Sequence, residues 1–217
     1  VDDYHPPLSL IDQWRIQTPA AAVKISPGVD YAELPPAAEA EFVSLSGEVK
    51  ECVLWYGPLR TAAARRATLL PYGFTLTSEQ PCDGIPIIEP QTFLYEPDGA
   101  IIRAHLVEHL AHQLGLSKID DQIAYLTAAH EVESPAVRAF RLYDWFPFQL
   151  KRLRHYLREH QIGQVVIKKR GSPIEPDTLR RQLRLSGKQK QATLFLTHVQ
   201  GTPAVLIGEE HKKEQQT

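Results

Sequence analysis

Apolar and polar positions in the last third of the chain follow a regular order of short segments. Segments rich in branched and aromatic side chains predict β-strands. They cover residues 137–146, 164–170, 192–199 and 203–209. Two segments between them predict helices with one leucine-bearing face. The leucines predicted to face inward are Leu150, Leu153, Leu157, Leu179 and Leu183. The order β-α-β-α-β-β predicts a small α/β sandwich in which two helices cover one face of a sheet.

The first third of the chain is rich in predicted strands and poor in helices. A proline-initiated segment at 6–14 predicts one short helix. Strands are expected at 20–28, 41–46, 51–57 and 65–73. The first has the small, apolar composition of a parallel-sheet strand and ends at Pro27-Gly28. The last is expected to pair back on its predecessor as an antiparallel hairpin. The pattern indicates the last part of an α/β sheet.

The middle of the chain predicts a connection between two domains. A proline-rich stretch at 77–100 predicts a linker. Residues 98–116 predict one long helix, capped by Asp98 and ended by Gly115. We therefore expect the last part of an α/β domain at 1–78, a linker with a helical connection at 79–135, a small α/β domain at 136–209, and a disordered tail at 210–217.

Charge divides the chain more sharply than the net value of −2 suggests. Residues 1–136 have a balance of −11, whereas residues 137–190 have a balance of +10. The basic part points to an anionic partner. No apolar run is long enough to predict a membrane span. The two cysteines, Cys52 and Cys82, lie far apart in sequence and fit a reduced, cytoplasmic protein.

The basic part offers three groups of candidate phosphate-binding residues. Each group lies on one predicted element, and the helical cations lie opposite the leucines. The candidates are Lys151, Arg154 and Arg158 on the first helix, Lys168, Lys169 and Arg170 on the strand, and Arg180, Arg181 and Arg184 on the second helix. Alternation along a strand puts Lys168 and Arg170 on one side and Lys169 on the other. The competing interpretation is an ordinary solvated helix face.

Other chemistry-bearing residues predict no active centre. His105, His109 and His112 recur at helical spacing, but their order differs from His-Glu-x-x-His, so we expect a polar helix face and no metal site. The chain has no Gly-x-Gly-x-x-Gly, P-loop or Gly-x-Ser-x-Gly sequence. Lys24 lies near the end of a predicted strand, where ligands of open α/β sheets bind, although a structural role at the sheet rim is equally consistent.

Several stretches together resemble one protein family. "YHPPLS", "VKISPG", "EFVSLSGEVKECVLWYG" and "RRATLLP" resemble the second half of a class I S-adenosylmethionine-dependent methyltransferase domain. "YEPDGAIIRAHLVEHLAHQLGL", "FRLYDWFPF", "VIKKRGSPIEPDTLRRQLRL" and "ATLFLTHVQGTPAVLIGE" resemble the THUMP-like C-terminal domain that follows it. The resemblance implies the C-terminal part of a Rossmann-like sheet followed by a THUMP-like α/β domain.

The resemblance also implies which parts are missing. The family binds S-adenosylmethionine in the first half of the Rossmann-like domain, through a Gly-rich turn, an acidic residue and an Asp-Pro-Ala-Arg-Arg stretch that this sequence lacks. We therefore expect the cofactor in the full-length parent only, no cofactor and no activity for this chain alone, and the missing N-terminal half as a partner. By analogy, residues lining the substrate cleft would be Pro6, Pro7, Lys24, Pro27 and Gly28.

Three hypotheses for function follow from these observations. The first is the C-terminal portion of a methyltransferase that acts on RNA, with the basic domain binding the RNA. The second is a non-catalytic interaction module whose basic face pairs with an acidic partner. The third, an autonomous small-molecule enzyme, requires a titratable pocket that the sequence does not indicate.

Overall fold

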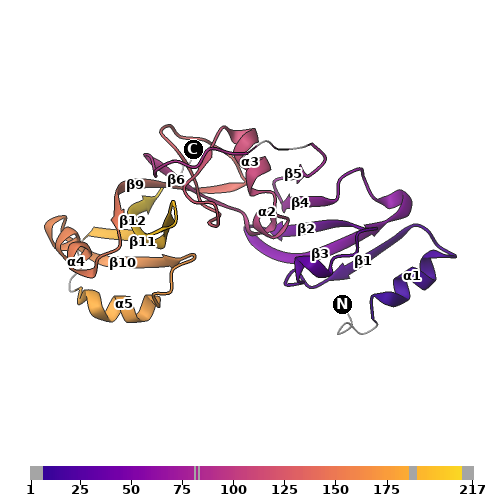
Figure 1. The fold of residues 1–217 in the computed structure, drawn as a ribbon, viewed down its shortest axis with the longest axis horizontal. Helices are drawn as coiled ribbons and strands as arrows, with labels where there is room; N and C mark the ends of the chain where they lie inside the picture. The colour runs from indigo at the N-terminus through magenta and orange to yellow at the C-terminus, as the bar shows by residue number, and fades with distance from the viewer. Residues whose placement is uncertain (1–6, 81, 83, 186–189, 212–217) are drawn as a thin grey trace. The chain divides into compact units, whose positions relative to one another are not determined.

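The computed structural model describes residues 7–80, 82, 84–185 and 190–211 (Figure 1). The chain forms two compact units. The N-terminal unit comprises Val1–Gly84 and Pro97–Gln113, and the C-terminal unit comprises Ile85–Glu96 and Leu114–Thr217. The stretch 79–135, expected to connect two domains, thus contributes to the body of both.

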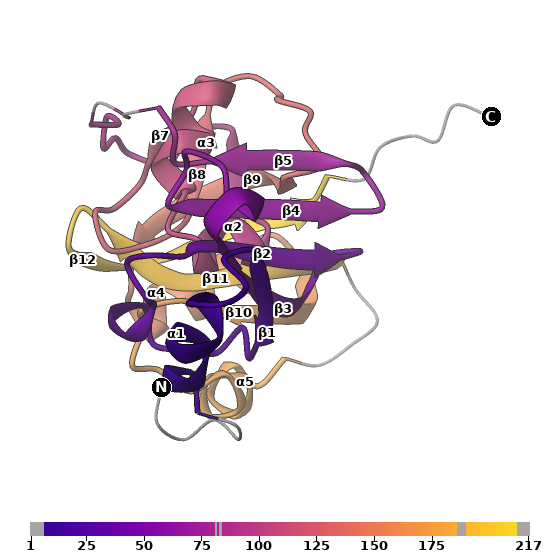
Figure 2. The same cartoon turned by 90° about the vertical axis from the view of Figure 1, so that its right-hand side faces the viewer.

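The N-terminal unit is built on a five-stranded sheet with the order β1-β3-β2-β4-β5 (Figure 2). The strands are β1 (Ala21–Ile25), β2 (Glu39–Leu45), β3 (Glu48–Tyr56), β4 (Arg65–Leu70) and β5 (Phe74–Thr77). β2 and β4 are parallel, and the other neighbours are antiparallel. Its helices are α1 (Ser9–Arg15), α2 (Gly99–Arg103) and α3 (Val107–Leu114), with short 3-10 turns η1 (Tyr31–Glu33) and η2 (Gly57–Leu59).

One face of this sheet is apolar and packs against α2. Phe42, Leu54 and Ala67 are almost fully buried there, and α2 contacts β2, β3 and β4. The helix approaches so closely that a Cβ at Gly99 would lie 2.6 Å from Val49. Only glycine fits this position without a shift of its neighbour.

Two predicted strand pairings in this sheet are wrong. β4 does not pair with β3, because β1 and β2 already occupy both edges of β3. It pairs with the free edge of β2, and in parallel. β1 was expected to be a buried, parallel strand, but it is half-exposed and antiparallel to β3. Composition predicted the strands themselves but not their partners.

The long helix predicted at 98–116 is in fact two helices, because the chain turns between α2 and α3. His105 has a φ of 54°, which ends the first helix. The Arg65 guanidinium holds the turn by donating to the carbonyls of Ala104 (3.3 Å) and His105 (3.0 Å). The His105 ring stacks on Tyr31 with centroids 4.2 Å apart. These tertiary contacts override a continuous helical pattern.

The C-terminal unit contains a seven-stranded sheet with the order β10-β11-β12-β9-β6-β8-β7. The strands are β6 (Phe93–Pro97), β7 (Ser117–Lys118), β8 (Leu126–Ala128), β9 (Val137–Pro147), β10 (Ile162–Lys169), β11 (Lys190–Val199) and β12 (Thr202–Glu210). The helices are α4 (Leu150–Glu159) and α5 (Pro176–Leu183). The predicted order β-α-β-α-β-β is therefore confirmed for β9 to β12.

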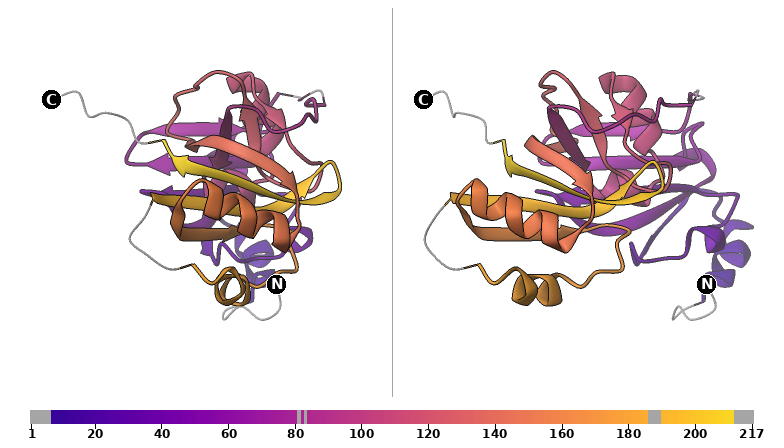
Figure 3. Two further views of the ribbon diagram at one scale, coloured as in Figure 1. Left: turned by 90° about the vertical axis from the view of Figure 1, so that its left-hand side faces the viewer. Right: turned by 60° about the vertical axis from the view of Figure 1, so that its left-hand side comes forward.

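Two apolar cores lie on opposite faces of this sheet. On one face α4 and α5 cover the strands (Figure 3), and Leu153, Leu157, Leu179 and Leu183 enter the core as predicted. On the other face Tyr125, Phe140 and Phe195 pack together with residues of the 85–128 region. Residues 212–217, most of the predicted tail, lie outside the described residues. Within the part of the chain that the structure describes, no helix is long and apolar enough to cross a membrane.

Candidate nucleic-acid interface

The helix α4 presents a basic outer face, because its buried positions are taken by leucines. Lys151 and Arg158 are exposed and have no ion pair with any described residue. Arg154 is half-buried and donates from Nε to the carbonyl oxygen of Gln182 at 2.9 Å. A cation there also complements the partial negative charge at the end of α5. Arg154 thus ties the two helices together, whereas Lys151 and Arg158 remain accessible.

The helix α5 carries its own counter-groups. Pro176 starts the helix, and Asp177 lies in its first turn. Asp177 accepts from Arg180 at 2.7 Å, and the Thr178 hydroxyl accepts from Arg181 at 3.3 Å. Both contacts join residues three positions apart on an exposed surface, so they contribute little to stability and can be exchanged for phosphates.

Arg184 ends α5 in an unusual backbone conformation. Its φ of 51° is in the left-handed region that glycine prefers. The side chain is exposed, and no hydrogen bond or ion pair joins it to another described residue. Three of the nine basic candidates, Lys151, Arg158 and Arg184, are therefore accessible cations with no hydrogen bond or ion pair to another described residue.

The basic triplet on β10 is split between two acidic partners. Lys168 pairs with the mostly buried Glu96, and Arg170 approaches the same carboxylate at 3.6 Å. Lys169 points the other way and pairs with Glu175 at 2.6 Å. This arrangement agrees with the alternation expected along a strand. It engages the partly buried Lys168 and Arg170 with Glu96, and it pairs the more exposed Lys169 with a surface glutamate.

The Lys168 and Arg170 side chains lie beside the rings of two buried aromatic residues. The Lys168 ammonium lies 5.0 Å from the centre of the Phe140 ring, and the Arg170 guanidinium lies 5.1 Å from that of Tyr125. Burial, with a smaller effect of Glu96, raises the pKa of Tyr125 to about 12. Lys168 and Arg170 are therefore structural cations that support the core on this face of the sheet.

The predicted cleft residues lie before α1 and at the end of β1. Pro6 lies outside the described residues. Pro7 precedes α1, and its carbonyl accepts from the amide of Leu10 at 3.1 Å. Lys24 is exposed and pairs with Glu51 on β3 at 2.6 Å. Pro27 and Gly28 follow β1, and the Gly28 amide donates to the Ser26 hydroxyl at 3.1 Å. No hydrogen bond among the described residues joins Pro7 to this turn.

The three histidines of the predicted helix face different neighbours. Burial, together with Arg65 and Arg103, lowers the pKa of His105. The His109 Nε2 lies 3.1 Å from the carbonyl oxygen of Gln80, and His112 is exposed. In the described residues, no three histidine, cysteine or acidic side chains converge as metal ligands.

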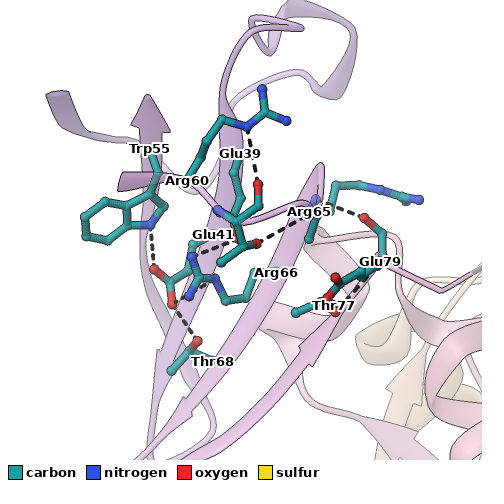
Figure 4. A network of polar contacts seen from close by, with 12 residues as sticks. Glu39, Glu41, Trp55, Arg60, Arg65, Arg66, Thr68, Thr77 and Glu79 are labelled. Atoms are coloured by element: carbon teal, nitrogen blue, oxygen red, sulfur yellow. Dashed lines mark hydrogen bonds and ion pairs between the residues drawn. The ribbon is translucent and has the colours of Figure 1, made fainter. Parts of the chain in front are cut away.

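Sequence reasoning missed a buried charge network on the second face of the N-terminal sheet (Figure 4). Glu39 is fully buried; one carboxylate oxygen pairs with Arg66 at 2.8 Å and the other accepts from the Thr61 amide at 2.6 Å. Glu41 accepts from Trp55 Nε1 at 2.7 Å and from the Thr68 hydroxyl at 2.5 Å. The alternating glutamates of "EAEF" carried the signal, since such acids on a central strand need partners.

These contacts favour a structural role for the network. Each carboxylate oxygen of Glu39 and Glu41 already faces a donor from a neighbouring strand or loop. The network joins β2, β3, β4 and the loop after η2, so it fixes the register of the sheet.

Comparisons with known proteins agree with this architecture. Residues 137–210 match the family described as THUMP domain-like. Two curated relatives from Mycobacterium tuberculosis, strains CDC 1551 and H37Rv, are described as uncharacterised S-adenosylmethionine-dependent methyltransferases. Each is 36% identical over 198 residues, which cover 89% of this chain and 54% of the relative. The chain thus spans about half the length of the curated relatives it matches.

A solved structure shares the fold. It is the crystal structure of a protein assigned as a methyltransferase from Porphyromonas gingivalis W83. The TM-score is 0.79 at 23% identity, over 97% of this chain and 56% of that chain. The chain is therefore similar to S-adenosylmethionine-dependent methyltransferases over about half of their length, and its residues 137–210 match the THUMP domain-like family.

Proposed function

We propose that this chain is part of an S-adenosylmethionine-dependent methyltransferase that acts on RNA, and that its THUMP-like domain binds the RNA. The observation that carries the proposal is the outward basic face of α4 and α5. Lys151, Arg158 and Arg184 lie on that surface without a described counter-charge. The similarity to two mycobacterial S-adenosylmethionine-dependent methyltransferases supports the methyltransferase part.

The electrostatics of α4 and α5 suit a phosphate backbone. Binding of a polyanion releases condensed counterions, so each phosphate contact adds affinity that falls with salt concentration. The described partners of Arg180 and Arg181 belong to α5 itself, so binding a phosphate would break no contact with a distant acidic segment. Basic side chains on two neighbouring helices bind phosphates without reading sequence.

The described residues of the N-terminal unit do not fit a cradle for S-adenosylmethionine. A nucleotide-type cofactor requires glycine backbone that it can approach closely. The sequence has no Gly-x-Gly-x-x-Gly turn, and the space beside Gly57 is taken by the chain itself, since a Cβ there would lie 2.2 Å from the Pro19 carbonyl oxygen. We therefore assign no step of methyl transfer to this chain. We expect no heat when the chain alone is titrated with the cofactor, and micromolar binding would contradict the assignment.

Fluorescence anisotropy with a structured RNA tests the binding part. Binding to the whole chain should weaken steeply as salt is raised. The double variant Lys151→Ala/Arg158→Ala removes two phosphate contacts, so the slope of log K against log salt should fall by about 1.4–1.8. A matched control, Lys50→Ala/Arg138→Ala, also removes two cations; both side chains are partly exposed, and each pairs with a surface glutamate.

Three results would contradict the proposal. Equal slopes for the two double variants would remove the α4 face from the interface. If an acidic peptide with the same charge as the RNA is bound more tightly and displaces it, that result would instead favour the interaction-module hypothesis. Binding of RNA with no salt dependence would exclude the electrostatic mechanism.

A further inference from the structure

A pocket of about 360 Å³ lies in the C-terminal unit between β9 and α4. Tyr143 and Asp144 line it from the strand. Five residues line it from the helix and its C-cap: Arg152, His155, Tyr156, Glu159 and the C-cap His160. Their spacing of three and four positions places them on one stripe of α4. The volume lies in the range typical of small-ligand sites, about 300–1,000 Å³.

The strand wall of the pocket is shaped by a β-bulge. In the pairing of β9 with β12, Asp144 lies opposite Ile207 and Leu142 lies opposite Gly208, so Tyr143 is the extra residue. A Cβ at Gly208 would lie 2.4 Å from the carbonyl oxygen of Arg141, so this position accepts only glycine. Bulges redirect side chains and recur beside functional sites.

Two planar groups lie at this pocket with one face supported by a ring. The Arg152 guanidinium lies 4.2 Å from the centre of the Phe146 ring. The His160 ring stacks on Tyr156 with centroids 4.0 Å apart and planes 17° from parallel. Arg152 and His160 are both exposed, so their outer faces remain available. Unstacked nucleobases stack on arginine planes and aromatic rings of this kind.

The pocket lining offers hydrogen-bond acceptors on Asp144, Glu159 and His160, beside the donors of Arg152. One Asp144 oxygen accepts from the Trp145 amide at 2.8 Å, and the other has no partner among the described residues. His160 Nδ1 lies 2.9 Å from the Tyr156 carbonyl oxygen, so it carries the proton and leaves Nε2 as an acceptor in the neutral ring. Glu159 adds an exposed carboxylate.

The carboxylates of Asp144 and Glu159 also influence the hydroxyl of Tyr156. Burial, followed by Asp144 and then Glu159, raises the pKa of Tyr156. Both acids therefore lie close enough to its hydroxyl to influence it. A base edge entering the pocket would meet these two carboxylates beside the stacking planes, and the cations Lys151 and Arg158 lie on the same helix outside the pocket lining.

We propose that the β9–α4 pocket binds one unstacked base of single-stranded RNA, with a preference for bases that carry an exocyclic amino group. Adenine, cytosine and guanine offer that donor to a carboxylate, whereas uracil does not. The inference rests on the proposed RNA-binding function and adds to it a strand and base preference that phosphate contacts cannot give.

The test uses the whole chain and short single-stranded oligonucleotides of adenine, cytosine or uracil, measured by fluorescence anisotropy at one salt concentration. The unsubstituted chain should bind the adenine and cytosine strands about tenfold more tightly than uracil. Asp144→Asn keeps the acceptor for the Trp145 amide but loses the charge, so it should reduce that preference. His160→Ala should weaken binding of the adenine strand about five- to 100-fold by removing a stacking plane.

Lys151→Ala is the matched control, because it removes a cation from α4 outside the pocket and should weaken all three strands equally. Melting temperatures of the variants separate loss of binding from loss of folding. Equal affinity for the three strands, unchanged in His160→Ala and Asp144→Asn, would overturn this inference and leave phosphate binding intact. Absence of binding to every single strand would overturn this inference alone if the structured RNA is still bound, and would overturn the proposed RNA function as well if it is not.

Discussion

The N-terminal unit buries charged side chains between neighbouring strands of its sheet, whereas the C-terminal unit exposes them on the outer faces of its helices. Glu39 and Arg66 are held by fixed donors and acceptors between neighbouring strands. Lys151 and Arg158 project from α4 with no described counter-charge. Charge count alone does not separate these cases, since both regions are rich in ionisable residues. The described partners of each group separate a structural role from a binding one.

Breaking the buried network should have the largest effect. Arg66→Met leaves the fully buried Glu39 carboxylate without its cation, so the free energy of unfolding should fall by about 3–5 kcal/mol. Urea unfolding followed by circular dichroism measures the loss. Lys50→Ala, which removes an exposed ion pair, should cost no more than about 0.5 kcal/mol. A small loss for Arg66→Met would mean that the network is not structural.

The pH dependence of stability gives a second measure of burial in the N-terminal unit. Burial raises the pKa of Cys52 from 9.0 to about 12, with opposing effects of Arg103 and Glu41. Because the folded state favours the neutral thiol, this contribution is complete below pH 9 and is lost as the pH rises towards 12. Unfolding free energies across that window should fall by about 2–4 kcal/mol more in the unsubstituted chain than in Cys52→Ala. Parallel pH curves would contradict the prediction.

Two neighbouring lysines of β10 allow the same comparison between a structural cation and a surface cation within one strand. Lys168→Met removes a cation paired with the mostly buried Glu96, so it should cost about 1.5–3 kcal/mol and leave RNA affinity unchanged. Lys169→Met removes an exposed pair and should cost less than about 1 kcal/mol. Urea unfolding and RNA anisotropy on both variants measure the change in stability and the change in RNA affinity. Weaker RNA binding by Lys168→Met would extend the interface onto β10.

The sequence predicted those parts of the fold that depend on local pattern. Strands β9 to β12 and the leucine faces of α4 and α5 follow from composition and helical spacing alone. The pairing of β4 with β2 was not predictable, because a strand does not encode which free edge it will meet. The break at His105 depends on Arg65, forty positions away in the sequence.

The candidate site shows the same limit. The cations of α4, β10 and α5 were visible as sequence clusters, but their partners were not. Glu96 lies 72 positions from Lys168, so nothing local distinguishes Lys168 from the exposed Lys169 beyond the alternation of the strand. The β9–α4 pocket was also hidden, because the bulge at Tyr143 arises from a register shift against β12.

Arg184 combines a strained backbone conformation with an accessible positive charge. Its substitution should change stability and RNA binding by the smallest amounts. Arg184→Gly relieves the left-handed φ of 51°, so the free energy of unfolding should rise by up to about 1 kcal/mol. The same change removes one cation, so the salt slope of RNA binding should fall by about 0.7–0.9. Arg184→Lys retains both the charge and the strain, and should change neither quantity appreciably. If Arg184→Gly raises stability without altering the slope, the end of α5 lies outside the interface, and the accessible cations of α4 carry the binding.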